Sequence, residues 1–289
     1  VGVDSVSGAF EAAGTPRLTQ PDPDIPVDTG AAAFFDVDNT LIQGSSLILL
    51  AQGLFKKRFI TLSELAPALR KQIRYRVSGS ENADDIAEGR EQALAVVKGK
   101  SVAELKQACR EIVDNRMLEK SYADTIELAA MHLAAGQQVW LVSATPVQIG
   151  QALAEQLGFT GALGTVAEEE DGKFTGRLVG DILHGPGKKH AVAALAASSG
   201  LDMSRCTAYS DSANDIPMLS MVGTAVAINP DRKLRHYAQE MGWTIYDYRH
   251  FRSATFATMR WLSIGALLAG FIGGAGIVGK RLWDANKES

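Results

Sequence analysis

Residues 31–40 read Ala-Ala-Ala-Phe-Phe-Asp-Val-Asp-Asn-Thr, a short apolar run that ends in two closely spaced carboxylates. A continuous apolar run of this length is typical of a strand that is buried on both faces of a parallel sheet. Ligands of an open α/β sheet bind beyond the carboxyl ends of its strands. We therefore expect a buried strand at 31–35 that delivers Asp36, Asp38 and Thr40 to a functional site.

Further apolar runs follow, with helical sequence between them. A helix is expected to open at Pro146, since proline suits the first helical position, and another helix covers 188–199. The Asp171-Gly172 pair indicates a β-hairpin. Strands that alternate with helices are typical of a parallel sheet, so the expected fold class is α/β with a Rossmann-like core. The expected strands after the first are 139–142, 207–209, 225–228 and 244–246.

One long stretch interrupts this alternation and has a helical pattern throughout. Within it, Thr61-x-x-Glu64 and Ser101-x-x-Glu104 have the spacing of a capping box at a helix start. Gly136 is suited to ending the last of these helices. The expected organisation is a core formed by 31–44 and 136–250, with a helical domain at 45–135 inserted after the first strand.

The two ends of the chain differ from the middle. Residues 1–30 carry four of the nine prolines, which block helix formation, so we expect a disordered leader there. Residues 261–279 are 19 residues without a charge, long enough to span a hydrocarbon core as a helix. Arg260 and Lys280 flank this stretch, and a transmembrane helix over 260–281 is the expectation. An apolar helix packed on a soluble domain is the alternative.

The glycines of this C-terminal segment bear on its contacts. Gly270-x-x-x-Gly274 would present a flat face for helix pairing, which favours a homodimer. The chain has two cysteines, which cannot make a disulfide framework, so a reducing compartment fits. We therefore expect a membrane-associated protein whose catalytic domain faces the cytoplasm.

The composition excludes several functional classes. Of the 289 residues, 46% are hydrophobic and 21% are charged, so the chain can bury a core and is not disordered as a whole. The net charge of −4 leaves no basic footprint for nucleic acid, and we expect no nucleic-acid partner.

Polar residues at the ends of the other expected strands complete a candidate site. Clustered carboxylates repel one another and need a cation, and a few hard oxygen ligands suit Mg²⁺. A lysine and a hydroxyl beside them make a phosphate site, with Lys188 as a point charge and Ser143 as a donor. The candidate residues are Asp36, Asp38, Thr40, Ser143, Lys188, Asp211, Asn214 and Asp215.

Four short motifs among these residues resemble, in the same order, those of the haloacid dehalogenase superfamily. Asp36-Val37-Asp38-Asn39-Thr40 resembles the first motif, DxDxT, and Leu141-Val142-Ser143 resembles the second, a strand that ends in serine or threonine. Gly185-Pro186-Gly187-Lys188 resembles the third, a lysine that opens a helix. Tyr209-Ser210-Asp211-Ser212-Ala213-Asn214-Asp215 resembles the fourth. The resemblance covers 31–230, and the shared order of four motifs makes it specific.

The resemblance implies a role for each residue. Asp36 would be the nucleophile that forms an aspartyl-phosphate, and Asp38 would protonate the leaving alcohol and then activate water. Mg²⁺ would bind the Asp36 carboxylate, the Asp38 backbone carbonyl and Asp211. Asp215 would support that metal site. Ser143 and Lys188 would bind the phosphoryl oxygens, and Asn214 would lie near the substrate.

The size and helical content of the insertion resemble the C1 cap of the phosphoserine phosphatase branch. That branch usually carries a glutamate nine residues after the nucleophile, where it meets the substrate amino group, and this chain has Ser45. The second motif there continues with glycines, and this chain has Ala144-Thr145-Pro146. Both departures weaken the case for phosphoserine as the substrate. Three cap arginines are candidates for contacting a substrate anion or for a solvated helix face: Arg70, Arg74 and Arg76.

The sequence therefore predicts a Mg²⁺-dependent phosphomonoester hydrolase that is similar to phosphoserine phosphatase and acts on a small phosphorylated substrate. Two alternatives stay open. The C-terminal segment motivates a membrane-anchored phosphatase that acts on a lipid phosphate. A non-catalytic, membrane-tethered binding protein that keeps the fold is the other.

Overall fold

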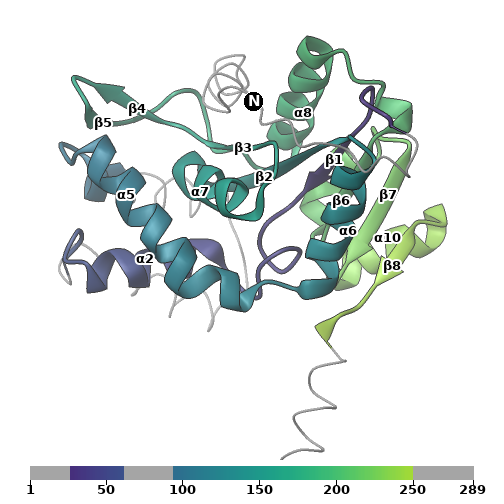
Figure 1. The fold of residues 1–289 in the computed structure, drawn as a ribbon, viewed down its shortest axis with the longest axis horizontal. Helices are drawn as coiled ribbons and strands as arrows, with labels where there is room; N and C mark the ends of the chain where they lie inside the picture. The colour runs from purple at the N-terminus through teal and green to yellow at the C-terminus, as the bar shows by residue number, and fades with distance from the viewer. Residues whose placement is uncertain (1–26, 62–93, 250–289) are drawn as a thin grey trace, which may run out of the picture. The chain divides into compact units, whose positions relative to one another are not determined.

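A six-stranded sheet determines where the candidate site lies. The computed structural model describes residues 27–61 and 94–249 (Figure 1). The sheet has the strand order β3-β2-β1-β6-β7-β8, and every neighbouring pair is parallel. Its strands are β1 Ala32–Phe35, β2 Gln138–Pro146, β3 Gly161–Thr165, β6 Thr207–Ser210, β7 Thr224–Ile228 and β8 Thr244–Tyr246.

Strand β1 lies inside the sheet, between β2 and β6. Phe34 pairs with Trp140 on one side and with Ala208 on the other. All four residues of β1 are fully buried, as the continuous apolar run predicts. The five expected strands and the parallel α/β class are confirmed. Strand β3 was not expected, because its sequence Gly-Ala-Leu-Gly-Thr contains two glycines, which are depleted in strands.

One face of the sheet packs against three helices, α8 Pro186–Ser199, α9 Ile216–Leu219 and α10 Arg232–Met241. Alternate strand residues, including Phe34, Trp140 and Val142, bury their side chains in this core. Trp140 and Phe34 are among the largest side chains with no exposed surface. The period of two in the strands thus gives each sheet face its own set of apolar residues.

The other face contacts α6 Ala123–Ala134 and α7 Val147–Leu157. Phe35 stacks on Tyr209 there with ring centroids 4.2 Å apart, and His132 of α6 meets both rings edge-on. Helix α7 begins one residue later than expected, because Pro146 keeps an extended ψ of 133° at its N-cap. Gly136, with a φ of 70°, follows α6 as expected for a helix stop.

The part of the helical stretch that the structure describes contains α2 Ser46–Lys56 and α5 Val102–Ile112, followed by a π-helical turn, Val113–Met117, and a 3₁₀ turn, Leu118–Lys120. Ser101 caps α5 by accepting a hydrogen bond from the Glu104 N–H at 3.3 Å, as its capping-box spacing predicts. Helix α6 also belongs to this stretch in sequence, but it packs on β1 and β2 of the sheet. The predicted boundaries at 45 and 135 stay predictions.

The expected hairpin is present as β4 Ala167–Glu170 and β5 Lys173–Leu178, with Asp171 and Gly172 at its turn. The segment before α5 pairs with it: Gly99 N–H donates to Phe174 at 2.7 Å, and Phe174 N–H donates to Lys100 at 3.1 Å. This pairing connects the segment before α5 to the hairpin, which follows β3 directly.

Several expectations fall outside the described residues. They are the leader up to residue 26, the Thr61-x-x-Glu64 capping box beyond residue 61, the cap arginines Arg70, Arg74 and Arg76, and the helix at 260–281. Within 27–61 and 94–249, no helix has the length and apolar character needed to cross a bilayer. The chain's contacts divide it into two units, Val1–Tyr246 and Asp247–Ser289, and the sheet belongs to the first.

Candidate active site

Asp36 lies immediately beyond the carboxyl end of β1, at the edge where ligands of such sheets bind. Its backbone N–H donates to the Tyr209 carbonyl at 2.9 Å, which continues the pairing between β1 and β6. The side chain is almost fully buried, and Thr40 Oγ1 donates to its Oδ2 at 3.3 Å. Asp36 is therefore a fixed carboxylate with little solvent around it.

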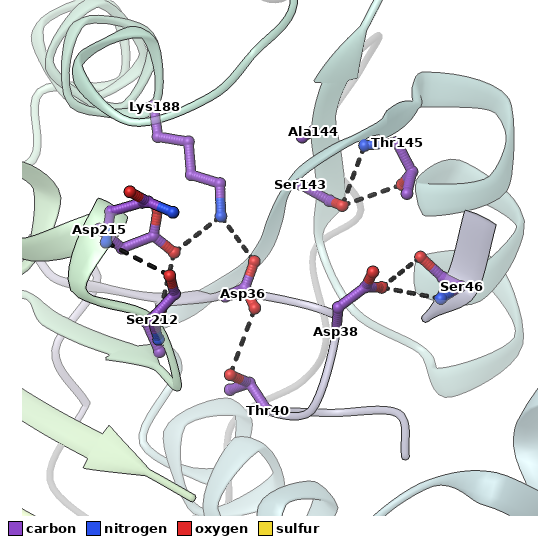
Figure 2. A network of polar contacts seen from close by, with 12 residues as sticks. Asp36, Asp38, Thr40, Ser46, Ser143, Ala144, Thr145, Lys188, Ser212 and Asp215 are labelled. Carbon is purple, nitrogen blue, oxygen red and sulfur yellow. Dashed lines mark hydrogen bonds and ion pairs between the residues drawn. The ribbon is translucent and has the colours of Figure 1, made fainter. Parts of the chain in front are cut away.

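Lys188 meets Asp36 from the first turn of α8. Its Nζ lies 2.6 Å from Asp36 Oδ1 and 2.8 Å from Asp215 Oδ2 (Figure 2). Only 5% of the lysine side chain is exposed. Pro186 occupies the first helical position and places Lys188 two residues further on, so the helix start aims the ammonium at the two carboxylates.

Asp215 is the most buried acid of the group, with 2% of its surface exposed. Ser210, the last residue of β6, donates from Oγ to Asp215 Oδ2 at 2.7 Å. Asp211 follows directly and is half-buried, and its backbone carbonyl accepts from the Asp231 N–H at 2.7 Å. Three predicted acids and the lysine thus lie close together. They come from the ends of β1 and β6, the start of α8 and the loop after β6.

The electrostatics of this group are dominated by burial. Burial raises the pKa of Asp36 from its ordinary 3.8 to about 8; Lys188 opposes this, and Asp215 and Asp211 add to it. Burial also raises the pKa of Asp211 to about 7, although the Asn39 side chain favours the ionised form and lowers it in part. Burial lowers the pKa of Lys188, but Asp36 and Asp215 more than offset this and hold it above its usual range. The single positive charge of Lys188 is therefore too small to balance the ionised forms of all three acids.

These residues fit a divalent cation. The buried Asp36 and the half-buried Asp211, both with raised pKa values, mark a place where added positive charge would stabilise the ionised acids. Carboxylate and carbonyl oxygens are the ligands that Mg²⁺ takes in proteins. No group of three acidic, histidine or cysteine side chains able to enclose a metal occurs in 27–61 and 94–249. The predicted set needs only two carboxylates, Asp36 and Asp211, because Asp38 would contribute its backbone carbonyl.

Asp38 points away from this cluster. Its Oδ1 accepts a hydrogen bond from the Ser46 backbone N–H at 2.9 Å and a second from Ser46 Oγ. Figure 2 shows Asp36 directed toward Lys188 and Asp38 directed toward Ser46 at the start of α2. The two carboxylates of the first motif thus have different partners, as two different chemical tasks would require.

Ser143 lies in β2 and is 4% exposed. Its Oγ lies 2.9 Å from Thr145 Oγ1 and accepts from the Thr145 N–H at 3.2 Å. Asn214 is exposed in the short turn after β6, and its backbone N–H donates to Ser212 Oγ at 3.3 Å. Lys189, the neighbour of Lys188 in the chain, is exposed. The substrate-binding roles of Ser143 and Asn214 stay predictions.

The structure adds residues that sequence reasoning did not assign. They are Asn39, Ser46, Thr145, Ser210 and Asn229. Asn39, Thr145 and Ser210 lie within or directly after the four motifs, but no role was assigned to them. Asn229 directly follows an expected strand, and this position could have indicated a site residue. Asn229 Nδ2 donates to the Asn39 carbonyl at 2.8 Å, and both residues have positive φ values of 48° and 54°. Ser46 had no sequence signal, since its contact depends on how the loop after β1 folds.

Comparison with known proteins identifies the class that this fold and site define. The family model described as haloacid dehalogenase-like hydrolase matches residues 33–220. The chain belongs to this family of hydrolases. The matched residues contain all four motifs on which the resemblance rests.

Particular relatives narrow the class. "Phosphoserine phosphatase SerB1" of Mycobacterium tuberculosis is 56% identical over 229 residues, which cover 79% of this chain and 74% of the relative. "Putative hydrolase ML2424" of Mycobacterium leprae is 50% identical over 248 residues, 86% of this chain and 83% of the relative. The prediction of a phosphatase is confirmed by these similarities.

A solved structure of a protein of unknown function from Bordetella pertussis Tohama I is similar in fold. It has a TM-score of 0.66 and 28% identity, and the match covers 76% of this chain and 99% of that one. The architecture built around β1 and α8 thus recurs over the full length of another member of this fold.

Proposed function

We propose that this protein hydrolyses a small phosphomonoester through an aspartyl-phosphate formed on Asp36, with Mg²⁺ as its cofactor. The observation that carries the proposal is the position of Asp36, buried at the end of an internal strand with Lys188 Nζ 2.6 Å from its Oδ1. A buried carboxylate next to a fixed cation is suited to attack phosphorus, because the cation attracts the phosphoryl group and lowers the pKa of the carboxyl group against the effect of burial.

The first step transfers the phosphoryl group. An Asp36 carboxylate oxygen forms a bond to phosphorus while the bond from phosphorus to the ester oxygen breaks. Asp38 gives a proton to the departing oxygen, and the alcohol leaves. Lys188 remains beside Asp36 and neutralises charge on the transferring group.

The second step releases phosphate. A water molecule attacks the phosphorus of the aspartyl-phosphate, and Asp38, now ionised, accepts its proton. The acyl-phosphate bond breaks, inorganic phosphate leaves, and the Asp36 carboxylate and the Asp38 carboxylic acid are restored. Mg²⁺, held by Asp36, the Asp38 carbonyl and Asp211, would supply positive charge next to the transferring group in both steps.

For the substrate, we propose phosphoserine as the first candidate, because the M. tuberculosis relative bears that name and is 56% identical. Phosphoserine phosphatases usually have a glutamate that contacts the substrate amino group, and this chain has Ser45 at that position. If phosphoserine is the substrate, its amino group must therefore be bound in a different way. The uncharged stretch 261–279 supports a lipid phosphate as the second candidate. Comparing rates on phosphoserine and on lysophosphatidate in detergent separates them, and a large preference for phosphoserine would exclude the lipid.

The chemistry is tested with Asp36→Asn on a panel of phosphomonoesters with Mg²⁺. We expect turnover to be abolished in a folded protein, and an acid-quenched wild-type reaction to carry one phosphoryl group on Asp36 by mass spectrometry. Asp114→Asn, at an exposed aspartate of the π-helical turn, is the matched control and should keep its activity. Wild-type turnover by Asp36→Asn would overturn the assignment, and inactivity of the wild type on the whole panel would favour the binding-protein alternative.

A further inference from the structure

Ser46 makes the two hydrogen bonds that Asp38 accepts. It is the first residue of α2, and none of its surface is exposed. Both its backbone N–H, at 2.9 Å, and its hydroxyl donate to the same oxygen, Asp38 Oδ1 (Figure 2). In the described part of the chain, no hydrogen bond to Oδ2 of Asp38 is present.

This contact replaces an ordinary helix cap. The first N–H groups of a helix lack partners within it, and a side chain at the N-cap position usually accepts one of them. Ser45 occupies the N-cap position of α2 in an extended conformation, but its side chain makes no capping bond. Asp38, eight residues before Ser46, accepts the bond instead. The carboxylate proposed as acid and base is therefore attached to the first turn of α2.

The contact also decides which oxygen of Asp38 can carry a proton. A backbone N–H can only donate, so the Oδ1 that it meets must accept. In the protonated acid the hydrogen then lies on Oδ2, which has no hydrogen-bond partner among the described residues and can give the proton to a leaving alcohol. We propose that Ser46 is a positioning residue that fixes Asp38 with Oδ2 directed to the leaving oxygen.

The inference rests on the proposed function, because it needs Asp38 as the general acid. Its rival is that Ser46 and Asp38 only stabilise the start of α2. The positioning role and the structural role predict different effects of the leaving group on the rate of a Ser46 variant. An alcohol is a poor leaving group and needs the proton, whereas p-nitrophenolate leaves without one. A purely structural role would alter both reactions alike.

The experiment compares kcat/KM for an alkyl phosphate (phosphoserine or glycerol 2-phosphate, whichever the wild type hydrolyses faster) with kcat/KM for p-nitrophenyl phosphate. This parameter covers the steps up to release of the alcohol or phenol, so it reports the first transfer and not the later attack of water. The ratio of the two values on one preparation does not depend on the fraction of folded enzyme.

For Ser46→Ala we expect kcat/KM on the alkyl phosphate to fall about tenfold or more, and on p-nitrophenyl phosphate by less than about threefold. Ser46→Thr, which restores the hydroxyl, should recover the wild-type ratio. If Ser46→Ala does not fold, Ser46→Cys, with its weaker donor, should shift the ratio in the same direction by less. Ser101→Ala removes the side-chain cap at the start of another helix, α5, and should leave the ratio unchanged.

An equal loss on both substrates, or a gain on the alkyl phosphate, would overturn the positioning role. A gain would mean that Ser46 holds Asp38 away from the substrate. A wild-type enzyme that hydrolyses neither substrate class would overturn the proposed function, and this inference with it.

Discussion

Lys188 Nζ lies 2.6 Å from Asp36 Oδ1, although the two residues are 152 positions apart in the chain. The same ammonium lies 2.8 Å from Asp215, so one buried cation separates two buried carboxylates. Removing one partner from such a group leaves uncompensated charge in a medium that solvates it poorly. The arrangement therefore couples the stability of the fold to the chemistry of the site.

Replacing Lys188 with methionine should lower both the activity of the enzyme and the stability of the fold. We expect kcat to fall at least about 100-fold, because a fixed charge that stabilises the transferring group is lost. The free energy of unfolding should fall by about 3 kcal/mol or more, since Asp36 and Asp215 lose their counter-ion. Lys189→Met is the matched control at an exposed neighbour and should change neither. Kinetics and urea denaturation check this, and an active Lys188→Met enzyme would contradict it.

The raised pKa values predict how Mg²⁺ and pH act together. The pKa of Asp36 is raised to about 8 and that of Asp211 to about 7, so between about pH 4 and these values the folded protein binds more protons than the unfolded chain. Without a divalent cation, these groups make stability decrease as pH rises through that window. A cation that favours the ionised acids should oppose the decrease most at its upper end.

We therefore expect Mg²⁺ to raise Tm more near pH 8 than near pH 5. Thermal melts with EDTA or with Mg²⁺ at the two pH values measure this difference. Asp36→Asn should flatten the pH dependence measured in EDTA, because it removes a titrating group. A Mg²⁺ effect of the same size at both pH values would count against the cation site.

The residues of the candidate site could be located from the sequence because the proposed reaction restricts both residue type and spacing. Asp36, Lys188 and Asp211 had to be acids and a lysine near strand or helix ends, and a linear pattern records such requirements. Their supporting contacts leave no such record. Ser46 reaches Asp38 only because the loop between them turns back, and the positive φ of Asn39 in that loop is a property of the folded backbone.

Strand β3 was missed for a related reason. Gly161 and Gly164 lower its strand propensity, but each occupies a position where a side chain has no room. A Cβ on Gly161 would lie 2.5 Å from the Trp140 ring. Close packing across the sheet thus overrides local preference, and local preference was the only information that the sequence pattern supplied at that point.

Asn229 offers a test of the loop after β1. Its Nδ2 donates to the Asn39 carbonyl at 2.8 Å, and its φ of 48° suits asparagine or glycine. We expect Asn229→Gly to keep the backbone but lose the bond, which should raise the Mg²⁺ concentration needed for half-maximal activity, because the Asn39 side chain also favours the ionised form of Asp211. Asn229→Ala should show the same change and lose about 1 kcal/mol more stability from its backbone conformation.

Titration of activity with Mg²⁺ and chemical denaturation of both variants measure the two effects separately. Equal stability of the glycine and alanine variants would contradict the conformational part. An unchanged Mg²⁺ requirement in both would contradict the coupling between Asn229 and the cation site.

Gly164 of β3 lies against the backbone that follows Ser143, the residue predicted to bind phosphoryl oxygens. A Cβ there would lie 2.7 Å from Val147 Cα and 3.0 Å from the Thr145 carbonyl, both backbone atoms that cannot rotate away. Gly164→Ala must therefore displace the start of α7, and Thr145, which contacts Ser143, moves with it. We expect a loss of about 1–3 kcal/mol in stability and weaker competitive inhibition by inorganic phosphate.

Gly150→Ala is the matched control, inside α7. Outside α7, the described residue that its added Cβ would meet is Ala162, whose methyl group lies at 3.0 Å. Alanine is favoured over glycine in a helix by about 1 kcal/mol, so the two effects oppose each other. Phosphate inhibition should stay at the wild-type level in this variant. If Gly164→Ala binds phosphate as tightly as Gly150→Ala does, Ser143 and Thr145 do not form part of the phosphate site, because the displaced backbone is the one that carries them.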